Sequence, residues 1–494
     1  MDLMIESRLK NMRRLFRSKD SSSRRLSLSN WRREKRQQFV TEKYRKIDSE
    51  WYSLDTEDDN DLGINSCDDI KCLDVLFGYL SGQTLINDFT AKKVFVSVKS
   101  YLKNNTDLCK DLMTQQFFLT LSTFVSKPII SSQIRFAALD LIQDIVKYEQ
   151  NDELMVKNKT ILHILVNFNA SDIEVVTKTV VLMQELTRYS SRLLVIAIDN
   201  GYLLFLMKII ESTQVFTQRK STETIRSKRL SEKKFQLIRE VSESLRLIAN
   251  ELTTTDVIKD LYSIFGKLLH FKDNKIIINA LSSLKIIIGR NPETIVLLNR
   301  NLMLSTTDLM SKNNQTISSI VVQFWKLFYE AIDYTVFESF KSLLIESNLI
   351  QKLYEILSKV DNKGLVSEVA DFLYEFVDRF DNSFELLVPF DIYHSLIIAL
   401  SGCNQLTQRQ VLTTINRIVD RIESLEMVTH FLKIELLEAL VPFLGSSDPG
   451  LMTVSSRTLY QLMKKAEEFG LRDVVLIRAE YCSLNVGSLC PQIN

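Results

Sequence analysis

Basic side chains crowd the first 46 residues of the chain, and ionic attraction is the chemistry that they could perform. Fifteen basic residues stand between Arg8 and Lys46, against three acidic ones, so this stretch carries a net charge of +12. Because the whole chain of 494 residues carries only +1, the remaining residues sum to −11. A basic arm on a mildly acidic body requires an acidic partner, either that body or another molecule.

Patterns that would support catalysis or metal binding are absent from the sequence. It holds no Gly-rich phosphate loop, HExxH motif, CxxC pair or nucleophile elbow. The four histidines stand singly, and the six cysteines lack the spacing of a metal site or a disulfide framework, so we expect reduced thiols. We therefore expect no enzymatic activity, no metal, no cofactor and no small-molecule substrate.

Composition indicates which elements must carry the basic arm. The chain is 45% apolar, enough for a large core, yet it contains only 12 Gly and 6 Pro. Sheets and catalytic loops need such turn formers, whereas helices joined by short polar corners do not. No apolar run approaches the roughly 18 residues that a membrane helix needs, and the charged N-terminus shows no secretory signal. We expect an all-α protein without integral membrane contact.

Amphipathic helices recur with a period of about 40 residues. The segments 134–148, 173–189, 276–291 and 317–332 are each apolar at i, i+3/4 and i+7. A polar corner, a short helix and another apolar run follow the first two of them, at 160–168 and 201–210. A single unit is too small to bury such a face, so neighbouring units must stack into a solenoid. Three helices in 40-odd residues favour a right-handed armadillo array, and two-helix HEAT repeats are the near alternative.

Changes of composition suggest the domain boundaries. We expect a basic arm, disordered or helical, over residues 1–48, an acidic linker over 49–65, a solenoid of about nine to ten repeats over 66–486 and a tail over 487–494. The polar and basic segment 211–234 interrupts the array, and we expect it to be a disordered surface loop.

Residues 8–46 resemble the importin-β-binding domain of the importin-α family. The matching pieces are Arg8-Leu9-Lys10-Asn11, Arg24-Arg25, the helix-forming stretch 31–36 and the basic run 43–46. A generic nucleic-acid or nuclear-import tail is the alternative for the arm alone. The resemblance implies carrier-binding roles for Arg13, Arg14, Arg24, Arg25, Arg32, Arg33, Lys35, Arg36, Lys43, Arg45 and Lys46.

The body is similar to the same family over nearly its whole length. Residues 171–210, with an Ile-Asp-Asn-Gly corner, look like one family repeat, and 459–485 look like its last helix. The third helix of a family repeat carries W-x-x-x-N along a concave groove, where indole faces and Asn side chains hold a nuclear localisation signal. Here the Trp-equivalent positions read Asp140, Val181, Leu247 and Ser282, and the Asn-equivalents read Asp144, Glu185, Glu251 and Ile286.

Carboxylates therefore stand at most of the Asn-equivalent positions, and the stacking Trp residues are mostly missing. Only Trp325, followed by Tyr329, keeps an aromatic at such a place. We expect the groove to bind basic peptides through Asp140, Asp144, Glu185, Glu251, Trp325 and Tyr329. The four carboxylates should share one track along successive third helices, although solvated faces of ordinary helices would produce the same pattern.

The resemblance implies a nuclear import adaptor that shuttles between cytoplasm and nucleus. Its groove would bind cargo proteins with basic localisation signals, and its arm would recruit an importin-β-type carrier. The arm would also autoinhibit the groove as a tethered competitor. The alternative is an armadillo scaffold whose basic tail binds anionic membrane or RNA.

Overall fold

The computed structural model describes residues 69–475, apart from 115, 128, 149–150, 218–224, 252–254, 312–313, 333–343, 360–362, 380–382 and 472. The chain divides into two compact units, Met1–Ile70 and Lys71–Asn494. Within its described residues the second unit is built of helices and contains no strand. The expected boundaries at 48, 65 and 486, and all expected carrier-binding residues, lie outside the described part of the chain.

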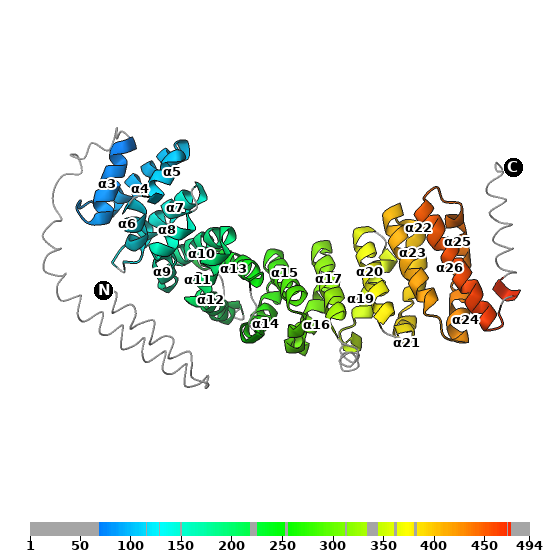
Figure 1. Ribbon diagram of the computed structural model, residues 1–494. Coiled ribbons are helices and arrows are strands. Elements are labelled where there is room, and N and C mark those ends of the chain that lie inside the picture. The colour runs from blue at the N-terminus through cyan, green and yellow to red at the C-terminus, as the bar shows by residue number, and fades with distance from the viewer. Residues whose placement is uncertain are drawn as a thin grey trace. The chain divides into compact units, whose positions relative to one another are not determined.

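Among the described residues, nine long helices form one layer of this unit, and each packs against the next one along the chain (Figure 1). We call them the third helices, because two shorter helices precede most of them. They are α4 (Asp88–Asn104), α7 (Ser132–Tyr148), α10 (Ile173–Tyr189), α13 (Ile225–Ala249), α15 (Asn274–Arg290), α17 (Gln315–Ala331), α20 (Lys363–Arg379), α23 (Gln405–Asp420) and α26 (Pro449–Glu468).

Shorter helices complete the repeats. The second helices are α3 (Asp69–Ser81), α6 (Gln116–Val125), α9 (Thr160–Leu165), α12 (Tyr202–Thr217), α14 (Thr255–Leu269), α16 (Arg300–Asp308), α19 (Leu349–Lys359), α22 (Ile392–Gly402) and α25 (Leu436–Leu444). The first helices are α5 (Asp107–Thr114), α8 (Asp152–Lys157), α11 (Ser191–Asp199), the 3₁₀ helix η3 (Pro292–Leu297), α21 (Ser383–Leu387) and α24 (Leu425–Lys433). Three 3₁₀ turns, η2 (Val166–Asn169), η4 (Leu309–Ser311) and η5 (Val388–Phe390), end shorter helices. The layers bury each other's apolar faces, as the periodicity predicts.

One repeat departs from the three-helix plan. Between the end of α13 at Ala249 and the start of α14 at Thr255, the described residues form no helix. Within its described residues, the repeat that ends with α15 therefore has two helices. The array combines the armadillo plan with one unit of the two-helix kind.

The segment 211–234 is not the single surface loop that its composition predicts. Helix α12 continues to Thr217, and α13 begins at Ile225 and runs for 25 residues. Only residues 218–224 lie outside the described part of this segment. The expectation was wrong because Lys, Arg, Glu and Gln are polar but favour the helix nearly as strongly as Leu does.

Asn and Asp residues fix the start of most third helices. Within the described residues, the side chain at the N-cap accepts a hydrogen bond from the first-turn backbone in six of the nine. For example, Asn87 Oδ1 accepts from Thr90 N at 2.8 Å, and Asp273 Oδ1 accepts from Lys275 N at 2.9 Å. The six N-cap residues are Asn87, Asp172, Asp273, Asn314, Asn404 and Asp448. Each cap satisfies an otherwise unpaired N–H group and sets the register of its helix.

The corner before the second helix repeats a left-handed backbone. Gly201, before α12, has a φ of 92°, a conformation that glycine adopts without steric cost. Four other repeats place a residue with a side chain at the same corner, with φ between 53° and 61°. These residues are Lys159, Asn348, Asp391 and Glu435. The Ile-Asp-Asn-Gly corner noticed in the sequence is thus one case of a turn that recurs in five repeats.

The far ends of several third helices are tied to the preceding one by arginine. Arg379 Nη1 donates to the carbonyl oxygens of Tyr329 and Glu330 at 2.9 and 2.8 Å. Arg290 and Arg421 donate in the same way to the carbonyl oxygens of Asn250 and Asp378. A guanidinium satisfies terminal carbonyls that lack an intrahelical partner and complements the negative end of the helix dipole.

Among the described residues, no single helix is long and apolar enough to cross a membrane. Two bent helix pairs, Ser191–Asp199 with Tyr202–Ser212 and Ser383–Phe390 with Ile392–Gly402, reach the required length and composition only when taken together.

Candidate peptide-binding surface

Equivalent positions on the third helices can be counted from the N-cap as position 0. The numbering of α13 follows from a contact that two repeats share. Arg409, at position 5 of α23, bonds to Asp448, the N-cap of the next third helix, and Arg239 bonds in the same way to the N-cap Asp273. Arg239 is therefore position 5 of α13, and Phe235 is position 1. Position 9 is then Val96, Asp140, Val181, Glu243, Ser282, Gln323, Asp371, Thr413 and Arg457. Position 13 is Ser100, Asp144, Glu185, Leu247, Ile286, Leu327, Glu375, Arg417 and Gln461. We call the residues at positions 5, 6, 9, 12 and 13 the third-helix surface.

Asp140 is the centre of an ionic cluster that joins three helices. Lys99 of α4 and Lys178 of α10 both donate hydrogen bonds to its carboxylate, whose side chain is 23% exposed. Asp144 Oδ2 lies 3.4 Å from Lys99 Nζ. Burial alone would raise the pKa of Asp140, but the bonds from Lys178 and Lys99 outweigh it and hold the pKa below its ordinary value. Asp140 and Asp144 therefore lie on the expected surface, already paired within the chain.

The same side-chain bridge recurs along the surface. A lysine at position 12 reaches the acceptor at position 9 of the next third helix, as in Lys285 Nζ to Gln323 Oε1 at 2.6 Å and Lys326 to Asp371. A side chain at position 6 donates to the acceptor at position 9 of the preceding third helix, as Gln410 Nε2 does to Asp371 Oδ1 at 3.2 Å. A bound peptide would meet an array of carboxylates and amides that is partly occupied by the protein's own lysines.

Of the two other predicted carboxylates, Glu185 lies on the third-helix surface and Glu251 does not. Glu185 lies at position 13 of α10, with Oε1 4.0 Å from Arg188 Nη1. Glu251 follows the end of α13, with Oε1 3.5 Å from Ser191 Oγ, so its assignment to the shared track is wrong. The residue that occupies position 9 of α13 is Glu243, which accepts hydrogen bonds from Arg246 at 2.6 and 2.9 Å.

Trp325 and Tyr329 do not face the open surface, so the expectation that they line it is wrong. Trp325 is 1% exposed and Tyr329 is fully buried. They stand at positions 11 and 15 of α17, on the side that faces the second layer and α20. Tyr329 packs against Phe372 and Phe376 of α20 with ring centroids 5.5 and 5.4 Å apart. Gln323 and Leu327 occupy the positions where the aromatic was expected.

Sequence reasoning missed Glu243, Asp371 and Glu375 at positions 9 and 13. The available signal was the N-cap residue, since counting nine from Asn314 leads to Gln323 and not to Trp325. Alignment on the most conspicuous aromatic shifted the register by two residues. The bridging lysines give no such signal, because their partners lie on another repeat.

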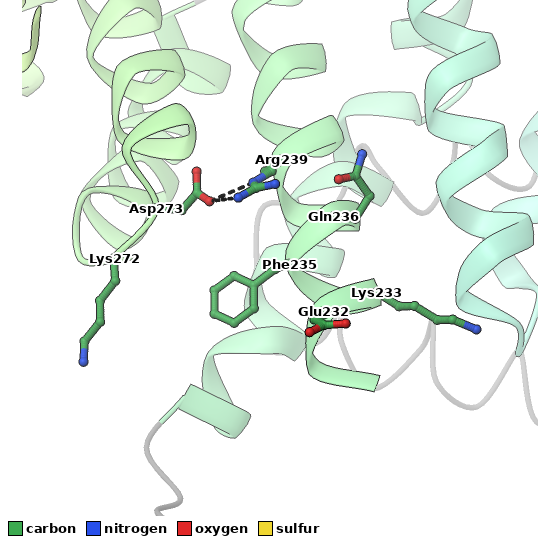
Figure 2. A pocket seen from close by; sticks show the side chains of 7 residues that line it. All are labelled: Glu232, Lys233, Phe235, Gln236, Arg239, Lys272 and Asp273. Carbon is green, nitrogen blue, oxygen red and sulfur yellow. Dashed lines mark hydrogen bonds and ion pairs between the residues drawn. The ribbon is translucent and has the colours of Figure 1, made fainter. Parts of the chain in front are cut away.

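A pocket of about 610 Å³ opens between residues 232–239 of α13 and the corner before α15 (Figure 2). Arg239 Nε lies 2.7 Å from Asp273 Oδ2, and Figure 2 shows the guanidinium spanning the two helices. Phe235 stands below this pair and meets Phe271 edge to face, with ring centroids 6.4 Å apart. On the far side, Lys233 Nζ is 2.6 Å from Glu174 Oε1. The charges that line this pocket are thus largely neutralised within the chain.

Among the described residues, no group of three His, Cys, Asp or Glu side chains is arranged to hold a metal ion. Cys109 and Cys403 are buried.

Comparison with known proteins bears on the fold. No family model and no curated protein sequence matches the chain. The crystal structure of an engineered protein matches 80% of this chain and 99% of its own, with a TM-score of 0.55 and 13% identity. Together with the repeat architecture, this shows the fold. The chain is an armadillo-type solenoid.

Two designed proteins are also similar, each over 52% of this chain and 99% of its own, at 15% identity. One is a computationally designed armadillo repeat protein for modular peptide recognition, with a TM-score of 0.40. The other is a designed armadillo repeat protein in complex with the peptide (KR)4, with a TM-score of 0.39. Likeness at this level says nothing about what this chain binds.

Proposed function

We propose that this chain is a non-enzymatic adaptor that binds an extended basic peptide across its third helices. The observation that carries the proposal is that carboxylates occupy position 9, position 13 or both on four of the third helices, α7, α10, α13 and α20. Side chains that project from neighbouring helices at one register present a linear track to an extended chain. The six carboxylates are Asp140, Asp144, Glu185, Glu243, Asp371 and Glu375.

We further propose that the adaptor acts in nuclear import, moving between cytoplasm and nucleus. Its ligands would be cargo proteins with basic localisation signals. The basic stretch 8–46 would recruit an importin-β-type carrier, as its resemblance to the importin-β-binding domain suggests. The net charge of +12 on this stretch supports an acidic partner. The same stretch would compete with cargo for the carboxylates until the carrier takes it up.

Binding at this surface would be governed by charge. Lys99 and Lys178 already pair with Asp140, Lys326 pairs with Asp371, and Arg246 pairs with Glu243. A lysine or arginine of the peptide that displaces one of them therefore gains only the difference in free energy between the new ion pair and the old one. Side chains at positions 9 and 13 supply no indole for stacking. We therefore expect moderate affinity that falls steeply with ionic strength, because the pairs are partly exposed.

The test is binding of the full chain to an importin-β and to a basic signal peptide. Reversal of Arg32, Arg33, Lys35 and Arg36 to Glu should abolish carrier binding, because each attractive pair becomes a repulsion. The same variant should bind the peptide more tightly, because the competitor is weakened. Carrier binding equal to that of the parent would refute the import role.

A second candidate function is a scaffold whose basic tail binds anionic membrane or RNA. One observation favours it: the position-9 carboxylates Asp140, Glu243 and Asp371 already pair with basic side chains of this chain. Titration of the full chain with single-stranded RNA or with anionic vesicles, against salt, distinguishes the two. A steep salt slope on RNA or vesicles, without importin-β binding, would favour the scaffold.

A further inference from the structure

A second pocket, of about 420 Å³, lies between the first halves of α20 and α23. Its lining includes Glu368 and Asp371 of α20, together with Asn404, Leu406 and Gln410 at the start of α23. It lies at the N-terminal ends of the third helices, away from the track at position 13. None of these residues was singled out by the sequence.

Other repeats show what fills the equivalent place. In the α13–α15 pair, Arg239 at position 5 crosses to the N-cap Asp273. In the α23–α26 pair, Arg409 at position 5 crosses to the N-cap Asp448, with Nη2 2.7 Å from Oδ1. In the α20–α23 pair, position 5 is Ser367 and the N-cap is the neutral Asn404. A guanidinium that two interfaces supply from within the chain is therefore missing from this one.

The carboxylates of this pocket are incompletely paired. Glu368 Oε1 accepts from Ser319 Oγ at 2.8 Å and from Gln323 Nε2 at 3.0 Å. Its Oε2 is buried and has no hydrogen-bond partner, and among the described residues no cation forms an ion pair with Glu368. Asp371 pairs with Lys326, and Gln410 donates to it. Of the two carboxylates, only Asp371 is thus paired with a cation. A buried carboxylate oxygen without a donor, such as Glu368 Oε2, is costly.

We propose that the α20–α23 pocket binds an arginine side chain of a partner peptide. The proposal deepens the function proposed above and rests on it. A planar guanidinium presents parallel donors, so it can reach Glu368 and Asp371, which lie one helical turn apart, better than an ammonium can. Leu406, which is 76% exposed, would contact the aliphatic stem. Both intramolecular groups at equivalent places are arginines.

The test uses the full chain and a fluorescein-labelled octapeptide of alternating Lys and Arg, with an all-Lys octapeptide as the comparison. Glu368→Gln keeps the oxygen that accepts from Ser319 and Gln323 but removes the charge. It should lower the affinity for the Lys/Arg peptide about tenfold and the affinity for the all-Lys peptide less, since the loss of a hydrogen bond to a charged group accounts for such a factor. Ser367→Arg should weaken binding as much, because it supplies the missing guanidinium from within.

The control is Glu232→Gln, which removes a carboxylate from the lining of the α13–α15 pocket, where Arg239 already pairs with Asp273, and it should leave the affinity unchanged. Parent-like binding by both Glu368→Gln and Ser367→Arg would overturn the pocket alone and leave the adaptor standing. Equal weakening of the two peptides would overturn the preference for arginine. A parent chain that binds neither peptide would overturn the pocket together with the adaptor.

Discussion

Neutralising Asp140 should loosen the three helices that its carboxylate joins. The change Asp140→Asn keeps the shape and an acceptor oxygen but leaves Lys178, whose side chain is 12% exposed, facing an amide. Each charge-assisted hydrogen bond contributes about 1.5–3 kcal/mol when well buried, and partial exposure lowers this. With two such bonds at 12–27% exposure, we expect a loss of about 2 kcal/mol.

Because a solenoid need not unfold in one step, the loss should be read locally by hydrogen exchange and mass spectrometry. Protection in peptides from α4, α7 and α10 should fall about 30-fold, the factor that corresponds to about 2 kcal/mol. Peptides from α23 and α26 serve as the internal reference and should not change. The matched variant Asp371→Asn should instead loosen α17, α20 and α23. Unchanged exchange in α4–α10, or an equal loss in α26, would refute a local role for the Asp140 cluster.

Three further predictions concern stability. Burial lowers the pKa of His163 below its ordinary 6.5, so the neutral ring stabilises the fold above pH 6.5, and this contribution is lost as pH falls through the lowered pKa. His163→Leu should therefore make the melting temperature depend less on pH between pH 7 and 5. An unchanged slope of melting temperature against pH would contradict this. Glu435→Gly should raise stability by about 0.5–1 kcal/mol in thermal melts, because removal of left-handed strain exceeds the entropic cost of glycine, whereas Gly201→Ala should lower it. Trp325→Ala should cost about 3–5 kcal/mol, seen as lost exchange protection in α17 and α20, and intact protection there would place the indole outside the core.

The solenoid was predictable because its signal is a period. Amphipathic stretches that cannot bury their faces alone require stacking, whatever the details of each repeat. The candidate surface was only partly predictable, because it depends on register. The carboxylates of Asp140, Asp144 and Glu185 were placed on the surface, but Glu251 was taken four residues beyond the equivalent position, Leu247. Trp325 was chosen for its residue type, but it is 1% exposed and belongs to the core.

The pairing of the surface charges could not be predicted, for a physical reason. A lysine such as Lys326 meets Asp371 because two third helices pack at a given offset, and no local pattern encodes that offset. The cavity beside Glu368 escapes sequence reasoning for the same reason. The cavity becomes evident only when the repeats are compared in space, because the α20–α23 interface has Ser367 where two other interfaces have an arginine.

The bridges between third helices also bear on how the chain folds while it is being synthesised. Lys99 and Asp140 are separated by 41 residues, Lys285 and Gln323 by 38, and Lys326 and Asp371 by 45. Each of these three bridges joins neighbouring third helices, so these interfaces can close as soon as one more repeat has left the ribosome. Until that repeat arrives, α4, α15 or α17 exposes its apolar flank together with a lysine that has no partner yet. The charge favours the solubility of the growing edge, and the carboxylate or amide that pairs with the lysine arrives with the helix that covers the edge.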